Sequence, residues 1–269
     1  MKLNRVYAAF LKFTFMSSLQ VTLLQSDLYW ENPEANRNHF EEMLQGLSSP
    51  QELVVLPEMF TTGFTVKAAG RAETMQGPTM QWMKTMAARY RIILCGSLII
   101  EEDGMYYNRL IWMQPNGQYG YYDKRHLFRY AGEDVEFSSG TRRFIARVNG
   151  LRICCLICYD LRFPELYRAI GTVDCHIIPA AFTYTTGKSH WEILLRARAI
   201  ENQCYVLASA QGGKHVNQRR TWGHSMLIDP WGDIQADLPE GEGFITGDLC
   251  KDKLNEVRSQ LPALAHRKL

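Results

Sequence analysis

The chain has 269 residues, of which 46% are hydrophobic and 22% charged, and this balance excludes a largely disordered chain. Its length fits one large domain or two small ones with a sizeable core. The net charge is +2 and no long Lys/Arg block stands out, so nucleic acid is not an expected partner. No apolar segment approaches the ~20 residues of a membrane-spanning helix, so a membrane is not expected either.

Residues 1–17 precede the first predicted strand, and we treat them as an N-terminal extension of uncertain status. Lys12 interrupts their apolar run and no clear cleavage site follows, so they do not read as a signal peptide. Translation could start at Met1 or at Met16. Residues 18–269 are predicted to form one domain. The seven cysteines are scattered and odd in number, which favours a reducing compartment, and we expect a cytoplasmic protein.

The remaining sequence alternates between strand-like and helix-like patterns, with hairpins between them. Short apolar runs predict strands, and apolar residues at helical spacing predict helices, three of which begin at a proline. Residues 124–140 and 180–187 are expected to be loops. The alternation argues for an α/β domain whose sheets are covered by helices. Strands are expected at residues 19–25, 53–56, 92–100, 105–113, 118–123, 144–148, 151–157, 175–179, 204–208, 226–228 and 244–249, and helices at 33–46, 78–90, from 164, 190–202 and 251–260.

Cys158 comes directly after the apolar run 151–157, shortly before a proline that can open a helix. A cysteine at the end of a strand would place its sulfur at the edge of the sheet. The next residue, Tyr159, could begin a turn whose backbone N–H groups point at whatever the sulfur attacks. We therefore expect Cys158 to be a nucleophile. Cys154 and Cys155 lie inside the run and are interpreted as buried structural cysteines.

Cys155 and Cys158 also form a C-x-x-C pair. A redox pair of this kind would sit at a helix N-terminus, where the thiol pKa is lowered. Here the pair lies in a strand-like run, where residues three apart point to opposite faces. No second paired Cys/His motif accompanies it, so we expect no metal site. A thiol-redox protein stays an alternative, and it predicts that Cys155 matters as much as Cys158.

Glu58 and Lys124 also follow predicted strands directly. Polar groups at the ends of neighbouring strands meet at one edge of a sheet, where α/β proteins bind ligands. We therefore expect both side chains to lie near Cys158, although each alone would be an ordinary solvated residue. A glutamate and a lysine already supply a base and a cation. Three histidines that could form a papain-like dyad with the cysteine are therefore interpreted as structural: His126, His190 and His224.

Three segments in this order resemble the signature segments of the nitrilase superfamily, the carbon–nitrogen hydrolases. They are Leu-Pro-Glu at 56–58, Asp-Lys-Arg-His-Leu at 123–127 and Cys-Tyr-Asp-Leu-Arg-Phe-Pro-Glu at 158–165, within a match from about residue 19 to about residue 267. The resemblance implies a single-domain α-β-β-α sandwich. It also implies a homodimer or larger homo-oligomer, with neither a metal nor an organic cofactor.

The resemblance further implies a catalytic triad of Glu58, Lys124 and Cys158. A thiol at its ordinary pKa is only slightly ionised at neutral pH, so it needs a base, which Glu58 can supply. Lys124 and the backbone N–H of Tyr159 can stabilise the oxyanion. The resemblance implies that the covalent intermediate is a thioester.

Members of the family carry a second glutamate in the loop after the lysine. Aligned on Gly140, the best match is Glu133, which would hold Lys124 and the substrate. Glu136 is close enough to leave a choice between the two glutamates.

The motifs point to two neighbouring branches of the family. Residues 56–64 and 122–128 resemble ω-amidases, whereas residues 190–192, 195–205 and 223–226 resemble amidases of deaminated glutathione. We expect an enzyme that hydrolyses the terminal amide of a small carboxylate-bearing substrate of the 2-oxoglutaramate type to acid and ammonia. Deaminated glutathione is the alternative substrate, and carbamoyl amides and nitriles are less favoured.

A carboxylate-bearing substrate calls for a cationic subsite. Arg162, four residues after the nucleophile, is the candidate, because a guanidinium binds a carboxylate bidentately. A structural ion pair is an equally open interpretation of Arg162. Four aromatic residues are candidates for the pocket walls or for the core: Phe64, Tyr130, Phe182 and Tyr184.

Overall fold

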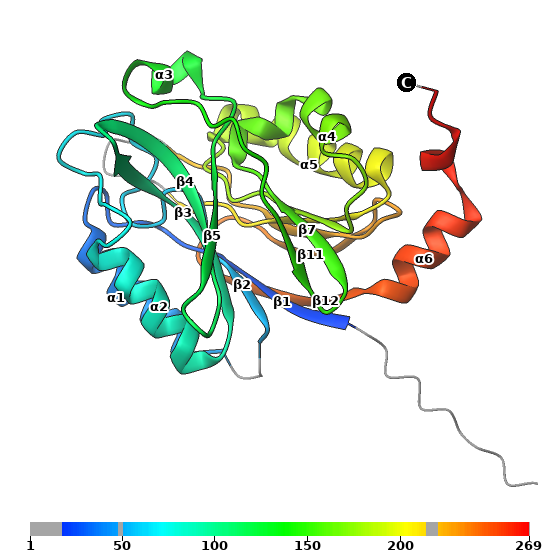
Figure 1. Ribbon diagram of the computed structural model, residues 1–269, viewed down its shortest axis with the longest axis horizontal. Coiled ribbons are helices and arrows are strands. Elements are labelled where there is room, and N and C mark those ends of the chain that lie inside the picture. The colour runs from blue at the N-terminus through cyan, green and yellow to red at the C-terminus, as the bar shows by residue number, and fades with distance from the viewer. Residues whose placement is uncertain (1–17, 48–50, 214–219, 269) are drawn as a thin grey trace, which may run out of the picture.

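The computed structural model of the protein describes residues 18–47, 51–213 and 220–268. The predicted N-terminal extension, residues 1–17, lies outside the described residues. Two six-stranded sheets pack face to face, and helices cover their outer faces (Figure 1). This is the α-β-β-α sandwich that the resemblance implied, so the predicted fold class is confirmed.

The first sheet has the strand order β12-β1-β2-β3-β4-β5. Its three central strands β1, β2 and β3 are parallel, whereas β12, β4 and β5 join by antiparallel pairing. Helices α1 and α2 pack on its outer face (Figure 1). The elements are β1 (Ser18–Gln25), α1 (Pro33–Gln45), β2 (Leu53–Val55), α2 (Pro78–Tyr90), β3 (Ile93–Glu102), β4 (Met105–Met113), β5 (Tyr119–Asp123) and β12 (Gly243–Cys250).

The second sheet has the order β11-β10-β9-β8-β7-β6, with β7, β8 and β9 parallel. Helices α4 and α5 cover it, and α6 continues from β12 at the far end (Figure 1). The elements are β6 (Ile145–Val148), β7 (Leu151–Cys155), α4 (Pro164–Ile170), β8 (Cys175–Ile177), α5 (Tyr184–Asn202), β9 (Tyr205–Ala208), β10 (Ser225–Ile228), β11 (Ile234–Leu238) and α6 (Lys251–Gln260).

The main core lies between the two sheets. Alternate residues of a strand point to one face, so each sheet contributes every second side chain to this layer. Leu23 of β1 and Leu110 of β4 pack in the same buried cluster as Ile153 of β7. Cys154 and Cys155 are also buried in it, as predicted. This shared core fixes the position of one sheet relative to the other, and with it the loops that leave the strand ends.

Most predicted elements agree with the structure to within a few residues, but three differ. Helix α5 begins at Tyr184 rather than at His190, because Gly187 allows the helix to approach Trp222 closely: an added Cβ would lie 2.3 Å from Trp222 Cβ. Strand β11 was not predicted. The expected loop 124–140 contains two short helices, η1 (Arg129–Ala131) and α3 (Glu133–Glu136).

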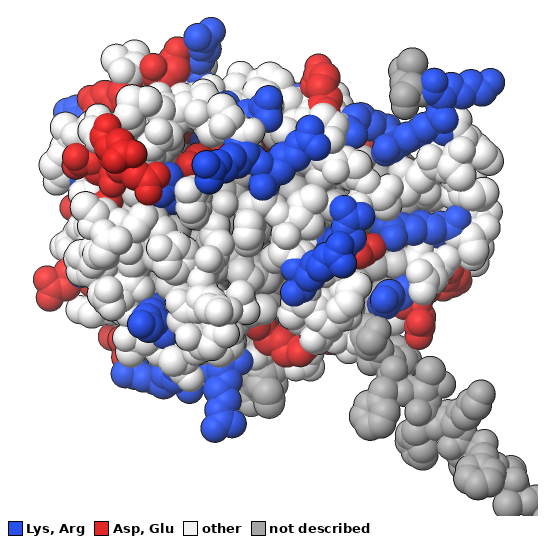
Figure 2. Space-filling view, viewed as in Figure 1, with Lys and Arg blue, Asp and Glu red and all other residues white. Residues whose placement is uncertain are grey.

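The surface shows no single dominant sign of charge in the view of Figure 2, where acidic side chains gather over the tip of the β3–β4 hairpin and basic ones spread over the neighbouring strands. Within the described ranges, none of the helices combines the length and the apolar character that crossing a membrane requires.

Candidate active site

Glu58, Lys124 and Cys158 converge at one end of the sandwich. Glu58 lies just beyond β2, Lys124 follows β5, and Cys158 lies just beyond β7. The expectation of one sheet edge was therefore wrong: two residues come from the first sheet and Cys158 from the second. The site lies between the sheets because their facing layers share one core. Glu58 and Lys124 are fully buried, and 8% of Cys158 is exposed.

The backbone presents Cys158 in a strained conformation. Its φ is 42°, in the left-handed region, which costs a non-glycine residue on the order of 1–3 kcal/mol. The N–H of Cys158 donates to the carbonyl of Pro179 at 2.9 Å, and this bond holds the turn in place. Met59, directly after Glu58, has a similar φ of 43°, and its N–H donates to Ser97 Oγ at 2.8 Å. Both reactive side chains are therefore carried by tightly fixed turns.

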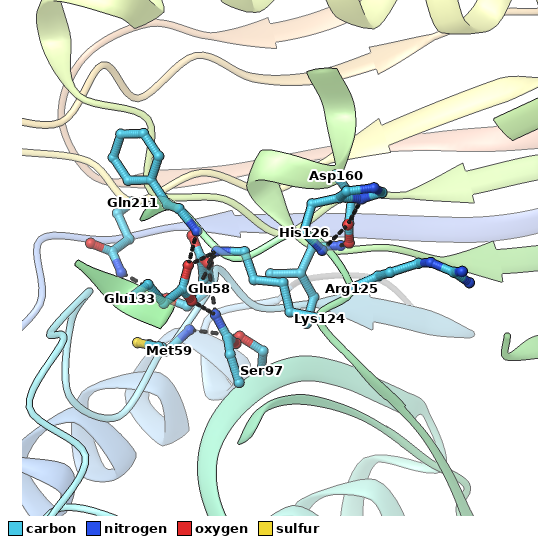
Figure 3. A network of polar contacts seen from close by, with 12 residues as sticks. Glu58, Met59, Ser97, Lys124, Arg125, His126, Glu133, Asp160 and Gln211 are labelled. Carbon is cyan, nitrogen blue, oxygen red and sulfur yellow. Dashed lines mark hydrogen bonds and ion pairs between the residues drawn. The ribbon is translucent and has the colours of Figure 1, made fainter. Parts of the chain in front are cut away.

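Lys124 lies between two carboxylates (Figure 3). Its Nζ is 2.8 Å from Glu58 Oε1 and 2.9 Å from Glu133 Oε2. Asn108 on β4 joins the same two groups, because its Nδ2 donates to Glu58 Oε1 at 2.9 Å and to Glu133 Oε1 at 3.1 Å. Asn108 was not among the predicted site residues. The one feature of the sequence that could have indicated Asn108 is its amide side chain next to the hydrophobic half of a predicted strand, because a buried polar group needs hydrogen-bond partners.

The structure distinguishes the two candidate second glutamates. Glu133 is fully buried against Lys124, and its Oε2 also accepts the N–H of Phe128 at 2.6 Å. Glu136 is exposed and accepts the N–H of Ala68 at 2.5 Å instead. Of the two, Glu133 is the residue that contacts the lysine.

Burial and neighbouring charges shift the pKa values of all three residues. Burial raises the pKa of Glu58, and Lys124 opposes this effect only in part. Burial alone would lower the pKa of Lys124, but the carboxylates of Glu133 and Glu58 raise it above its usual value. Burial, followed by the charge of Glu58, raises the pKa of Cys158 well above that of a free thiol. The Cys158 side chain therefore rests as a thiol, next to the carboxyl group of Glu58.

A backbone N–H group also acts on the sulfur of Cys158. The N–H of Ala181 interacts with the Cys158 side chain and lowers its pKa, which partly opposes burial. Ala181 was not a predicted site residue, because nothing in the sequence places it opposite the nucleophile. Tyr159, whose backbone N–H was predicted to help stabilise the oxyanion, is the second residue of the 3-10 helix η2 (Cys158–Arg162) and lines the pocket.

Asp160 joins the nucleophile turn to the end of β5. Its Oδ2 accepts the hydroxyl of Tyr122 at 2.8 Å and the N–H of Ile157 at 3.0 Å. Its Oδ1 accepts two bonds from His126. The three histidines considered as dyad partners each contact another residue: His126 contacts Asp160, His190 contacts Arg162 and His224 contacts Asp237.

A narrow inner pocket of about 60 Å³ opens at Cys158 and continues into a wider outer chamber of about 690 Å³. Of the predicted pocket residues, Phe64 and Phe182 line the inner pocket, Tyr130 and Tyr184 line the outer chamber, and Arg162 lines both. Lys124 Nζ lies 5.2 Å from the Phe64 ring centroid, so the apolar wall reaches the lysine. Further lining residues that were not predicted include Trp30, Phe128 and Arg220.

Arg162 is held by a histidine and by an aromatic ring. Its Nη1 lies 3.2 Å from His190 Nδ1, and its guanidinium lies 5.1 Å from the ring centroid of Phe182. Among the residues that the structure describes, Arg162 forms no ion pair with a carboxylate. The structural ion pair considered for it is therefore not observed, and no Asp or Glu is among the described residues that line the two pockets with it.

The states of the cysteines and of possible metal ligands bear on the redox and zinc alternatives. All seven cysteines are free thiols. The thiol of Cys155 interacts with Cys95, whereas Cys158 interacts with Glu58. In the ranges 18–47, 51–213 and 220–268, no group of three or more His, Cys, Asp or Glu side chains could hold a metal ion.

The family model described as carbon–nitrogen hydrolase matches residues 20–259. The chain belongs to this family. Its members hydrolyse carbon–nitrogen bonds other than peptide bonds, and this chain is therefore a hydrolase of that class.

Known proteins similar to this family member include two named amidases. One is the omega-amidase YafV of Escherichia coli K12, 36% identical over 92% of this chain and 96% of that protein. Another is a deaminated glutathione amidase of Synechocystis sp. PCC 6803, 39% identical over 88% of this chain and 93% of that protein. Among solved structures, XC1258 of Xanthomonas campestris, a CN-hydrolase superfamily protein with an arsenic adduct in the active site, has a TM-score of 0.90 and 36% identity, covering 94% of this chain and 98% of that chain.

Proposed function

We propose that this hydrolase is an ω-amidase that converts the terminal amide of a small carboxylate-bearing substrate, of the 2-oxoglutaramate type, to acid and ammonia. One observation carries the proposal: a buried thiol lies against a Glu–Lys pair whose Oε1–Nζ distance is 2.8 Å, at the base of a pocket that contains the cation Arg162. The similarity to proteins named ω-amidase supports the same substrate class.

The first half-reaction forms a thioester. Glu58 takes the thiol proton as the sulfur of Cys158 bonds to the amide carbon. The carbonyl oxygen becomes an oxyanion, which Lys124 stabilises together with backbone N–H groups such as that of Tyr159. The oxyanion then collapses, the C–N bond breaks, and Glu58 passes its proton to the departing nitrogen, which leaves as ammonia.

The second half-reaction releases the acid. Water gives a proton to Glu58 as its oxygen attacks the thioester carbon. The second oxyanion forms at the same place, beside Lys124. Its collapse breaks the C–S bond, and the proton on Glu58 returns to the sulfur of Cys158. Glu133 keeps Lys124 in position through both steps.

Arg162 is the proposed partner of the substrate carboxylate. A guanidinium with an acidic partner would have to give up that partner to bind a substrate. Among the described residues, Arg162 has no carboxylate partner, and its guanidinium contacts His190 and the rings of Phe182 and Tyr159. The apolar walls formed by Phe64 and Phe182 exclude water, which strengthens a charge pair. This arrangement favours an anionic substrate over an uncharged aliphatic amide.

Deaminated glutathione is the second candidate substrate, because one similar protein is named an amidase of this compound and because the outer chamber has room for a larger amide. A carbamoyl amide, a nitrile and a thiol-redox role have no comparable support. The cytoplasmic location and the homo-oligomer stay predictions. Ile193 and Ile200 are exposed on α5 and give a homo-oligomer a plausible contact surface.

Three substrates are compared: 2-oxoglutaramate, an uncharged aliphatic amide of similar length, and deaminated glutathione. Ammonia release is measured for the first two, and release of the acid is measured for deaminated glutathione. Cys158→Ala is the blank. Clear preference for 2-oxoglutaramate, lost in the blank, supports the proposal. Preference for deaminated glutathione would replace the substrate and keep the mechanism, whereas equal turnover of the uncharged amide would argue against a carboxylate subsite.

A further inference from the structure

The base and the nucleophile come from different sheets, so their spacing depends on contacts that cross between the sheets. Glu58 lies just beyond β2 of the first sheet, and Cys158 lies just beyond β7 of the second. The side chain of Glu58 bonds to Lys124 and Asn108, which also belong to the first sheet. A contact that reaches Glu58 from the second sheet would fix the base relative to the sulfur directly.

Gln211 makes such a contact. It lies beyond β9 of the second sheet, and its Nε2 donates to the backbone carbonyl of Glu58 at 2.7 Å (Figure 3). Gln211 is fully buried, and its Oε1 has no hydrogen-bond partner among the described residues. A buried acceptor without a partner is unfavourable, and an apolar side chain of the same length would avoid it. The amide is therefore better explained by its donor than by packing.

The backbone of Gln211 is joined to the backbone of the nucleophile turn. Three consecutive residues after β8 contact both. The carbonyl of Pro179 accepts the N–H of Cys158 at 2.9 Å, and the carbonyl of Ala180 accepts the N–H of Gln211 at 2.9 Å. The N–H of Ala181 interacts with the sulfur of Cys158. One short segment therefore holds both the nucleophile and the glutamine that reaches the base.

The peptide unit between Glu58 and Met59 is held from both sheets. Its oxygen, the carbonyl of Glu58, accepts from Gln211 of the second sheet. Its N–H, that of Met59, donates to Ser97 Oγ on β3 of the first sheet at 2.8 Å. Because a trans peptide unit is planar and its N–H and C=O point in opposite directions, the two bonds together fix its orientation.

This peptide unit leads into a strained residue. The φ of Met59 is 43°, in the left-handed region. Such a conformation persists only where the surrounding contacts over-determine it. Without the bond from Gln211, the peptide unit can rotate toward an unstrained conformation. The rotation would move the carboxylate of Glu58 away from the place where it takes the thiol proton.

We infer that Gln211 is a positioning residue, which holds the base Glu58 opposite the sulfur of Cys158 through the peptide unit between Glu58 and Met59. Gln211 is not among the described residues that line the two pockets, so its loss is expected to affect proton transfer more than substrate binding. The inference rests on the proposed function for the role of Glu58, but not for the identity of the amide.

Gln211→Met tests the inference, because methionine has a similar length and lacks the donor. A displacement of about 1 Å at a reacting group lowers rates roughly 10²-fold, so we expect kcat for 2-oxoglutaramate to fall by about 10- to 100-fold while KM changes less than about threefold. Alkylation of Cys158 by iodoacetamide at neutral pH also needs the base, and its rate should fall by about tenfold or more. Circular dichroism and thermal unfolding show whether the variant is folded.

Gln203→Met is the matched control. Gln203 is also a buried glutamine whose Nε2 donates to a backbone carbonyl, that of Leu261 at 2.5 Å. This bond joins the end of α5 to the segment after α6. The variant is expected to lose stability but to keep both kcat and the rate of alkylation.

Ser97→Ala acts on the same peptide unit from its N–H side and is a smaller change. We expect kcat to fall and KM to stay nearly constant, as for Gln211→Met. The loss in the double variant should be smaller than the product of the two single losses, because both side chains act on one group. If Gln211→Met does not fold, Ser97→Ala alone decides: an unchanged kcat overturns the inference, and a loss in kcat at nearly constant KM supports it.

Each outcome decides the inference. A loss of kcat at nearly constant KM in folded Gln211→Met, absent in Gln203→Met, supports it. An unchanged kcat in Gln211→Met, a loss that appears mainly in KM, or an equal loss of kcat in both glutamine variants overturns it. Failure of the unmodified enzyme to hydrolyse any amide counts against the proposed function, and the rate of Cys158 alkylation then decides whether Gln211 positions the base.

Discussion

Asp160 holds His126 by two hydrogen bonds at once: its Oδ1 accepts the backbone N–H at 2.9 Å and Nδ1 at 2.8 Å. The other oxygen of Asp160 accepts the N–H of Ile157, next to Cys158. One fully buried carboxylate therefore connects the segment that carries Lys124 to the turn that carries the nucleophile (Figure 3). The spacing between sulfur and lysine depends on it.

Asp160→Asn tests this positioning role. An amide has only one acceptor oxygen, so at least one of the donors around it loses its partner. A displacement of about 1 Å at a reactive centre lowers rates roughly 10²-fold, and we expect kcat to fall by about this factor while KM changes less than about threefold. Steady-state kinetics and the rate of Cys158 alkylation by iodoacetamide measure the effect.

Asp174→Asn is the matched control, because Asp174 also accepts a backbone N–H, that of Arg152, and pairs with Arg258 far from the site. This variant is expected to lose stability but to keep kcat. An equal loss of kcat in both variants would show that Asp160 matters only for folding.

The two glutamates of the η1–α3 segment give opposite predictions. Glu133→Gln removes a charge that holds Lys124, and since removal of an oxyanion donor lowers rates by about 10²–10³, we expect a loss of roughly 10²-fold or more in kcat. Glu136→Gln changes an exposed residue and is expected to stay within about threefold. Kinetics on one substrate compare them, and a larger effect from Glu136→Gln would reverse the assignment.

The pH dependence of activity follows from Glu58. The base must be ionised to take the thiol proton, so activity is lost as pH falls through its pKa. Burial raises that pKa, and the charge of Glu133 raises it further. The acid limb of kcat/KM should therefore have its midpoint above 4.5, and the residual activity of Glu133→Gln should show a lower midpoint. An unshifted midpoint in that variant would mean that another group controls the limb.

Cys155 and Cys158 separate a hydrolase from a redox protein. Cys155→Ser is expected to keep activity within about threefold, although a buried hydroxyl without a partner lowers stability by roughly 1–3 kcal/mol. Cys158→Ser should lose nearly all activity. Comparable losses from the two variants would favour the redox alternative.

His176 is predicted to make the fold sensitive to acid. It is fully buried on β8, neither ring nitrogen has a partner among the described residues, and burial lowers its pKa to about 3. The unfolded chain therefore binds a proton at this histidine below pH 6.5, whereas the folded chain does not until about pH 3. Stability falls as pH decreases through this window.

The change attributable to His176 between pH 7 and pH 5 is about 2 kcal/mol, since each pH unit below the unfolded pKa contributes about 1.4 kcal/mol. Urea unfolding at the two pH values measures it. His176→Leu cannot titrate, so its loss should be smaller by that amount, and an identical loss in both proteins would contradict the buried, neutral state.

The features that could be predicted from the sequence are those that depend on short segments of the chain. The strand ends at Glu58, Lys124 and Cys158 could be read from apolar runs followed by polar residues, and the motifs added the fold. The sequence did not predict that the three meet between two sheets. Asn108 and Arg220 were not predicted because their contacts depend on which distant segments pack together. The local hydrophobic periodicity of a sequence determines neither strand register nor loop packing.

The central claim is that the reaction passes through an acyl group on Cys158. Acid quenching of the enzyme during turnover of 2-oxoglutaramate, followed by mass spectrometry of the intact protein and its peptides, tests it directly. We expect a 2-oxoglutaryl adduct on the peptide that contains Cys158, and neither adduct nor ammonia release in Cys158→Ala. Undiminished turnover by Cys158→Ala, or an adduct on another residue, would contradict it.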